Sequence, residues 1–330
     1  MGASSPLGTP LTRLARVVAA ALALCSVPAL AHAQDRSAVL VFGAPGGETY
    51  AATYGKWEDA LVQSLQGRLA FAPDRITVLS GRSGDPSLRS TKENVRRVFA
   101  GLRSGSRDDV VLVVLIGHGT LDAGTAKFNL VGPDLDAAQW AALIEPLPGR
   151  VVFVNATGAS FPFLDQVSGR NRIVVTATDS TAQRFDTVFP DLFVKAMEDP
   201  ATDQDRNGRL SLYEVFAATS AAVRQYYEQR GQLATERALL DDNGDRIGRE
   251  ADAPGQDGAL ARTTYLDVDP VSAATDPQVA ALLTRQRVLE EQAEALKQRK
   301  PSMPAAVWEA QFEKLMIELA RVSRAIRSRS

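Results

Sequence analysis

A histidine between two glycines follows a long apolar run in this sequence. Residues 110–116 read VVLVVLI, and Gly117, His118 and Gly119 come directly after them. A continuous apolar run of this length is typical of a strand buried on both faces of a parallel sheet. Flanking glycines leave the imidazole open, and histidine suits acid–base chemistry near neutral pH. His118 is therefore the candidate general base; the alternative is a structural histidine that hydrogen-bonds the neighbouring loop.

Two hydroxyl side chains follow the next apolar run. Residues 151–154 read VVFV, and the segment NATGAS after them contains Thr157 and Ser160. Because neighbouring parallel strands end at the same edge of a sheet, where ligands bind, we expect this segment to lie beside His118. A hydroxyl group becomes a nucleophile only when a base removes its proton. Thr157 and Ser160 are therefore the candidate nucleophiles that His118 would activate.

Strand-like and helix-like segments alternate along the chain and predict the fold that positions these residues. Apolar runs of strand length occupy residues 37–42, 75–79, 110–116, 150–154 and 172–176. Helical patterns occupy residues 56–65, 90–102, 136–143 and 190–197. Ser90 and Glu93 have the spacing of a capping box at the start of the second helix. Such alternation predicts an α/β fold with a doubly wound, mostly parallel sheet flanked by helices.

The two loop motifs together resemble those of the caspase-like superfamily of cysteine peptidases, which includes legumain-type and gingipain-type enzymes. In that family one strand ends in His-Gly, and the next ends in Asp-Ala-Cys-x-Ser-Gly or Glu-Ala-Cys-x-Ser-Gly. His118 matches the first motif, while Asn155, Ala156 and Thr157 take the acidic, alanine and cysteine positions. Residues 171–178 resemble the family strand that helps form the specificity pocket. The resemblance covers residues 37–225 and implies a caspase-like domain over residues 35–270.

The threonine at the cysteine position changes the function that the resemblance implies. A histidine makes a thiolate available near neutral pH, whereas the hydroxyl of Thr157 has no such advantage. Threonine nucleophiles usually borrow an N-terminal amine, which an internal residue lacks. We therefore expect a pseudopeptidase that binds a peptide or protein partner. Two alternatives stay open: a hydrolase in which His118 activates Thr157 or Ser160, and an envelope scaffold that acts through its C-terminal helices.

The N-terminus has the pattern of a cleavable export signal. Arg13 and Arg16 precede an apolar run over residues 17–30, and Ala31-His32-Ala33 offers the small-x-small sequence that signal peptidase reads. We expect residues 1–33 to be a signal peptide and the mature chain to be periplasmic or secreted. No stable membrane span is expected after cleavage.

The single cysteine, Cys25, lies inside the expected signal peptide. Its removal would exclude disulfides, cysteine-based zinc sites and cysteine catalysis from the mature chain. The formal net charge of −2 argues against a nucleic-acid partner bound through bulk positive charge. We expect neither zinc nor a nucleotide as a cofactor.

Residues 203–214, DQDRNGRLSLYE, follow the pattern of a twelve-residue calcium loop. Gly208 stands at the sixth position, where the loop turns sharply. The expected ligands are Asp203, Asp205, Asn207, Arg209 through its backbone carbonyl, Ser211 and Glu214. Pro200 interrupts the approach, so a standard incoming helix is not expected. The alternative is a solvated turn that only caps the helix after it.

A second acidic cluster has part of the same spacing. Asp241, Asn243 and Asp245 fall on the first, third and fifth positions of a loop. Arg246 stands where glycine is wanted, and Asp252 is the carboxylate at the closing distance. Calcium is the expected cofactor, since millimolar calcium outside the cell fills even weak sites of this kind.

Two long amphipathic helices are expected at the C-terminus, over residues 277–328, with a break at residues 301–304. Their apolar stripes predict an antiparallel helical hairpin of coiled-coil type. The hairpin is expected to clasp the core, with partner binding or homo-oligomerisation through these helices as the alternative.

Overall fold

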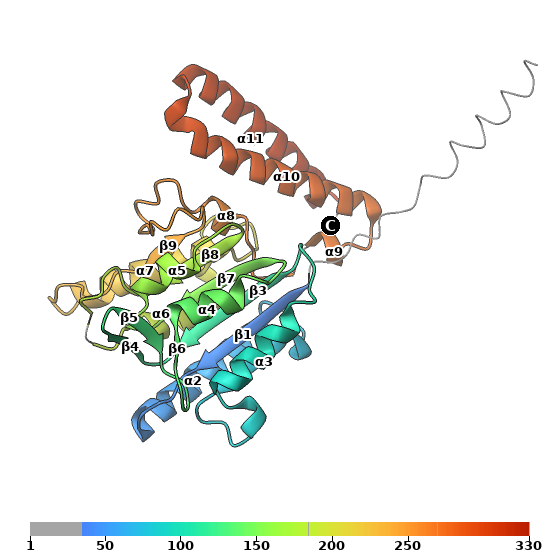
Figure 1. Ribbon diagram of the computed structural model, residues 1–330. Helices are drawn as coiled ribbons and strands as arrows, with labels where there is room; N and C mark the ends of the chain where they lie inside the picture. The colour runs from blue at the N-terminus through green and yellow to red at the C-terminus, as the bar shows by residue number, and fades with distance from the viewer. Residues whose placement is uncertain (1–34, 184, 269, 330) are drawn as a thin grey trace, which may run out of the picture. The chain divides into compact units, whose positions relative to one another are not determined.

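The structure is a computed structural model that describes residues 35–183, 185–268 and 270–329 (Figure 1). The expected signal peptide, including Cys25 and its cleavage sequence, lies outside the described residues. Export therefore stays a prediction from the sequence.

A six-stranded sheet forms the centre of the chain, in the order β2-β1-β3-β7-β8-β9. The strands are β1 (Arg36–Phe42), β2 (Ile76–Ser80), β3 (Val110–Ile116), β7 (Arg150–Asn155), β8 (Arg172–Thr176) and β9 (Leu239–Asp241). All neighbours are parallel except β8 and β9, which are antiparallel. The predicted α/β fold with a mostly parallel sheet is therefore confirmed. β9 was not predicted, because so short a strand has no detectable periodicity.

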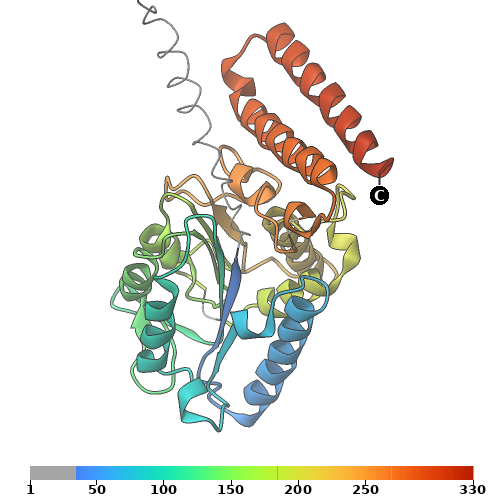
Figure 2. The ribbon, with the colours of Figure 1, turned by 90° about the vertical axis from the view of Figure 1, so that its right-hand side faces the viewer.

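Helices cover both faces of the sheet, as Figures 1 and 2 show. One layer consists of α2 (Glu48–Gln66), α6 (Phe189–Glu198) and α7 (Leu212–Glu228); the other consists of α3 (Lys92–Leu102), α4 (Ala137–Ile144) and α5 (Phe161–Val167). Successive residues of β1 alternate between the layers: Leu40 belongs to the apolar cluster on the α2 side, and Val39 and Val41 to the cluster on the α3 side. Because both faces are covered, β1 and β3 are apolar nearly throughout.

The start of α3 differs from the sequence prediction. Thr91 is the N-cap residue and accepts from the backbone N–H of Asn94 at 3.3 Å, so the predicted capping box of Ser90 and Glu93 is wrong. The backbone of Ser90 is already committed, since its N–H donates to Ser80 and its carbonyl accepts from Val131. These long-range bonds hold Ser90 outside the helix.

The remaining short elements lie in the connections. A three-stranded antiparallel sheet follows His118 directly, made of β4 (Gly119–Asp122), β5 (Thr125–Phe128) and β6 (Leu135–Asp136). The short helices are η1 (Pro73–Arg75), η2 (Pro86–Leu88), η3 (Pro200–Thr202), α8 (Ala259–Arg262) and α9 (Pro270–Ala273). Residues before α2 form a turn, and α2 begins at Glu48, well before the predicted start at residue 56.

The C-terminal helices form the predicted pair, α10 (Pro277–Arg299) and α11 (Ala305–Arg327), joined by η4 (Lys300–Ser302). The indole N–H of Trp308 donates to the carbonyl of Leu296 at 2.9 Å, and Arg285 pairs with Glu318 across the two helices. Homo-oligomerisation through these helices stays a prediction. Among the described residues, no helix has both the length and the apolar character needed to cross a membrane.

A buried glutamate from a distant segment caps α6. Glu236 is 1% exposed, and its two oxygens accept from the backbone N–H groups of Val188 at 2.8 Å and Phe189 at 3.2 Å. The hydroxyl of Tyr227 also donates to Glu236, at 2.8 Å. The first N–H groups of a helix have no partner inside it, so this carboxylate satisfies two of them and favours the helix dipole.

We predict that Glu236→Gln lowers the free energy of unfolding by about 1–3 kcal/mol, because an amide N–H₂ group would then face a backbone donor. Denaturant unfolding measures the change. Glu228→Gln, at an exposed position of α7, is the matched control and should have no measurable effect. Equal stability of the two variants would contradict the capping role.

Candidate functional site

The parallel pairing of β3 with β7 brings the two predicted loops together. Leu115 is opposite Asn155, and the backbone N–H of Ala156 donates to the carbonyl of Leu115 at 2.9 Å. Gly119 and Thr157 then approach closely: a Cβ atom built on Gly119 would lie 2.7 Å from the hydroxyl oxygen of Thr157. The expectation that both loops lie side by side at the carboxyl edge of the sheet is therefore met.

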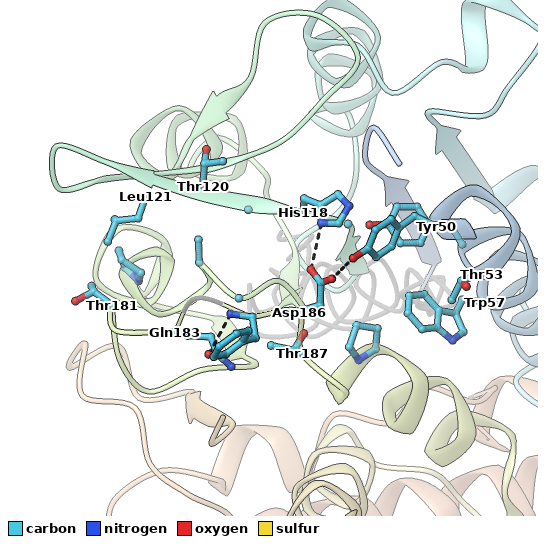
Figure 3. Close-up of a pocket in the computed structure, with 18 of the residues that line it drawn as sticks. Tyr50, Thr53, Trp57, His118, Thr120, Leu121, Thr181, Gln183, Asp186 and Thr187 are labelled. Carbon is cyan, nitrogen blue, oxygen red and sulfur yellow. Dashed lines mark hydrogen bonds and ion pairs between the residues drawn. The ribbon is translucent and has the colours of Figure 1, made fainter. Parts of the chain in front are cut away.

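His118 lies between two oxygen acceptors. Its Nδ1 is 3.2 Å from a carboxylate oxygen of Asp186, and its Nε2 is 3.2 Å from the carbonyl oxygen of Pro45. Tyr50 places its ring edge-on to the imidazole at 4.5 Å and donates its hydroxyl to Asp186 (Figure 3). Both ring nitrogens therefore face acceptors. Sequence reasoning missed Asp186, whose position in the loop after β8 carries no motif.

Thr157 lies in the interior beneath the His118 loop. It is 1% exposed, and its backbone N–H donates to the side chain of Asn155 at 3.1 Å. Its hydroxyl oxygen is buried and has no hydrogen-bond partner in the part of the chain that the structure describes. Thr157 thus lies against Gly119 in the loop that carries His118, but its hydroxyl makes no hydrogen bond to His118.

Ser160 joins the loop after β7 to the end of β8. It is fully buried, its hydroxyl is 3.0 Å from that of Thr178, and it accepts from the backbone N–H of Thr178 at 3.1 Å. Through these hydrogen bonds the Ser160 hydroxyl joins the two loops. Neither of the two predicted nucleophiles hydrogen-bonds His118 within the described residues, and both are shielded from solvent.

A pocket of about 360 Å³ opens beside His118. Such a volume is within the range of sites that hold small ligands or single side chains. Its walls are mainly aromatic and apolar, from α2, the loop after β8 and the start of α6: Tyr50, Tyr54, Trp57, Phe185 and Pro190. Burial, then the nearby charge of Asp186, raises the pKa of the Tyr54 hydroxyl, so it stays protonated as a donor. Figure 3 shows His118, Asp186 and Tyr50 meeting in this pocket.

The predicted calcium loop brings three carboxylates together. One ligand oxygen from each of Asp203, Asp205 and Glu214 lies within 4.8 Å of the others, so this triad can hold a metal ion. Burial raises the pKa of Asp205, and the charges of Glu214 and Asp203 raise it further. Like charges held this close favour a cation between them.

The side chains of the other predicted ligands make contacts of their own. The side-chain oxygen of Asn207 accepts from the backbone N–H of Arg209 at 2.7 Å, and Ser211 forms a capping box with Glu214 at the start of α7. The guanidinium of Arg209 turns away and pairs with Asp267 at 3.0 Å. It therefore does not place its charge among the carboxylates. The short helix η3 stands directly before the loop, where a standard calcium loop has its incoming α-helix. This agrees with the expectation drawn from Pro200.

The second acidic cluster follows β9. Asp241 is 1% exposed, and Asn243 and Asp245 follow it in a turn. Asp252, which the spacing proposed as the closing carboxylate, instead pairs with Arg224 at 2.7 Å on the surface. Asp257, which the sequence analysis did not single out, lies beside the loop and accepts from the backbone N–H groups of Asp242 and Asn243. Burial, then the charges of Asp241 and its acidic neighbours, raises the pKa of Asp257 to about 7.

Comparison of the sequence with protein-family models gave no match. Comparison with curated proteins gave no match either. The function must therefore be argued from the site itself.

We predict that Gly119→Ala lowers the free energy of unfolding by about 1–3 kcal/mol, because the new methyl group would overlap Thr157 and Ala159. Adding Thr157→Ala to this variant should recover part of the loss, since it removes the nearest overlapping atom. Gly101→Ala in α3 has open space around its Cβ and should be neutral or stabilising by up to about 1 kcal/mol. Denaturant unfolding of all four proteins measures these effects, and equal behaviour at positions 119 and 101 would contradict the close approach.

Proposed function

We propose that this chain is an exported pseudopeptidase of caspase-like type that binds a peptide or protein partner, with calcium stabilising its C-terminal half. One observation carries the proposal: an open pocket lies beside His118, whereas the hydroxyl at the family's cysteine position is buried and not hydrogen-bonded to that histidine. Binding can proceed in such a site without a nucleophile. Export is inferred from the pattern of residues 1–33.

The pocket supports recognition of a side chain rather than cleavage. Tyr50, Tyr54 and Trp57 contribute aromatic rings to the lining, and Asp186 adds one carboxylate to the same pocket. Aromatic rings next to a carboxylate attract cationic and aromatic groups. We therefore infer that the preferred peptide carries a basic or aromatic side chain and that acidic side chains are disfavoured.

Hydrolysis makes demands that the geometry does not support. A nucleophile and its base need to come within hydrogen-bond reach, about 2.6–3.2 Å, and the nucleophile needs access to substrate. The hydroxyl of Thr157 would have to rotate out from beneath Gly119, and Ser160 would have to leave Thr178. The hydrolase alternative thus needs a rearrangement of the loop after β7, which carries both hydroxyl groups.

We predict that the purified protein binds capped hexapeptides with a central Arg or Phe and cleaves none of a matched set with Arg, Phe, Asp or Asn. Trp57 lines the pocket, so its fluorescence should change saturably on binding, and Trp57→Phe should remove the signal. Phe185→Ala should weaken binding about tenfold, or ~1.4 kcal/mol, since this exposed ring lines the pocket.

The control for this experiment is Leu233→Ala, which removes another exposed apolar side chain, outside the pocket, and should leave the affinity unchanged. Cleavage of any of these peptides that His118→Ala abolishes would overturn the pseudopeptidase proposal. So would an absence of binding by the whole set.

The metal part of the proposal rests on the donor set of the loop. Asp203, Asp205 and Glu214 supply carboxylate oxygens, and Asn207 supplies an amide oxygen, all of which are hard ligands. Calcium prefers six to eight such oxygens, and exported proteins meet it at millimolar concentration. The loop also contacts the first turn of α7 through Glu214, so a bound ion would fix the start of that helix.

We predict that 1 mM calcium raises the Tm of chelator-treated protein, because an ion that binds only the folded state stabilises it by mass action. A site with a Kd tenfold below that concentration adds about 1.4 kcal/mol, which moves the Tm by a few degrees. Differential scanning calorimetry measures the shift. Glu214→Gln should reduce it, and a shift as large as that of the unmodified chain would show that this loop is not the site.

A further inference from the structure

The two acidic loops have left-handed residues at the same two positions. In the first, Arg206 and Gly208, the fourth and sixth residues, have φ values of 56° and 81°. In the second, Gly244 and Arg246 occupy the same positions and have φ values of 80° and 67°. The sixth residue is therefore left-handed in both loops, whichever residue stands there. Arg246 stands where a calcium loop usually has glycine, and it nevertheless adopts the left-handed conformation that the turn requires.

Side-chain hydrogen bonds also occur in register. The first aspartate of each loop accepts from the backbone N–H of the sixth residue, at 2.9 Å for Asp203 and 2.7 Å for Asp241. The side chain of the fifth residue accepts from the N–H of the seventh, at 2.7 Å for both Asn207 and Asp245. The side chain of the third residue accepts from the N–H of the fifth, at 3.0 Å for Asp205 and 2.7 Å for Asn243. Matching bonds thus place the first, third and fifth side chains of the two loops in equivalent positions.

A carboxylate from outside the second loop closes it. In the first loop, Glu214 accepts from the N–H groups of the second and third residues, at 2.9 and 3.4 Å. In the second loop, Asp257 accepts from the N–H groups of the second and third residues, at 3.1 and 3.4 Å. Asp257 therefore stands where Glu214 stands, although it comes from beyond the twelve-residue frame.

One carboxylate oxygen of Asp257 is buried without a hydrogen-bond partner in the described part of the chain. Asp257 is 1% exposed, and its Oδ2 has no hydrogen-bond partner among the described residues. Burial, together with the negative charges of Asp241, Asp242 and Asp245, raises the pKa of Asp257. Burying an unpaired carboxylate oxygen is costly, and carboxylates in such a place are usually paired or bound to a metal.

The neighbouring carboxylate, Asp242, is fully used by the protein. Its oxygens accept from the backbone N–H groups of Gly258 and Ala261, both at 2.8 Å. Asp242 thus caps α8 and fixes the segment that carries Asp257. We propose that Asp241, Asn243, Asp245 and Asp257 form a second site for a hard divalent cation of the calcium class, with Asp257 as the closing ligand.

This site would link the two loops through one segment. Residues 257–266 supply Asp257 to the second loop and pair with the first through two backbone bonds, Leu266 N–H to Leu210 and Leu212 N–H to Thr264, both at 2.8 Å. A cation held by Asp257 would therefore fix the segment that forms backbone hydrogen bonds with the first loop. The inference does not depend on peptide binding at the His118 pocket.

Isothermal titration of the chelator-treated full chain with calcium chloride tests the proposal. We expect two calcium ions per chain for the unmodified protein and one for Asp257→Asn. Glu214→Gln should also bind one, through the second loop alone. Asp252→Asn is the matched control: it changes the carboxylate at the spacing of a standard loop, and it should still bind two ions.

Asp245→Ala provides an independent variant at an exposed position and should also bind one ion. The proposal is overturned if Asp257→Asn, with an unfolding transition like that of the parent, still binds two ions. It is equally overturned if Asp252→Asn loses an ion, or if the unmodified chain binds a single ion that Glu214→Gln abolishes.

Discussion

The parallel pairing of β3 with β7 is the constraint on which the candidate site depends. It fixes the loops after the two strands side by side and leaves room only for a glycine at position 119. The same close approach seals the Thr157 hydroxyl inside the protein. The Thr157 hydroxyl thus lies inside the protein without a hydrogen bond to His118 among the described residues.

Segments far from these strands complete the site. Glu236 caps α6 from a distant part of the chain, and the residues before that helix carry Asp186 to His118. Tyr50, from α2, bonds the same carboxylate and packs against the imidazole. The histidine is therefore held by a carboxylate from the loop after β8 and by an aromatic ring from α2.

The acidic loops show the same dependence on distant residues. The first loop carries its own closing carboxylate, so spacing alone identified Asp203, Asp205 and Glu214 as a group that can hold a metal ion. In the second loop, the carboxylate at the expected spacing, Asp252, pairs with Arg224 at the surface. Asp257 fills the equivalent place because α8 and the chain before it fold back onto the loop.

The sequence by itself determined the five parallel strands of the central sheet, the helical pair at the C-terminus and the first acidic loop. Each depends on neighbours within one segment: a buried strand needs an apolar run, an amphipathic helix needs its stripe, and a loop needs its spacing. Only the tertiary structure decided the cap of α3 at Thr91, the partner of His118 at Asp186 and the place of Asp257. These depend on hydrogen bonds between residues far apart in the chain, which no local pattern encodes.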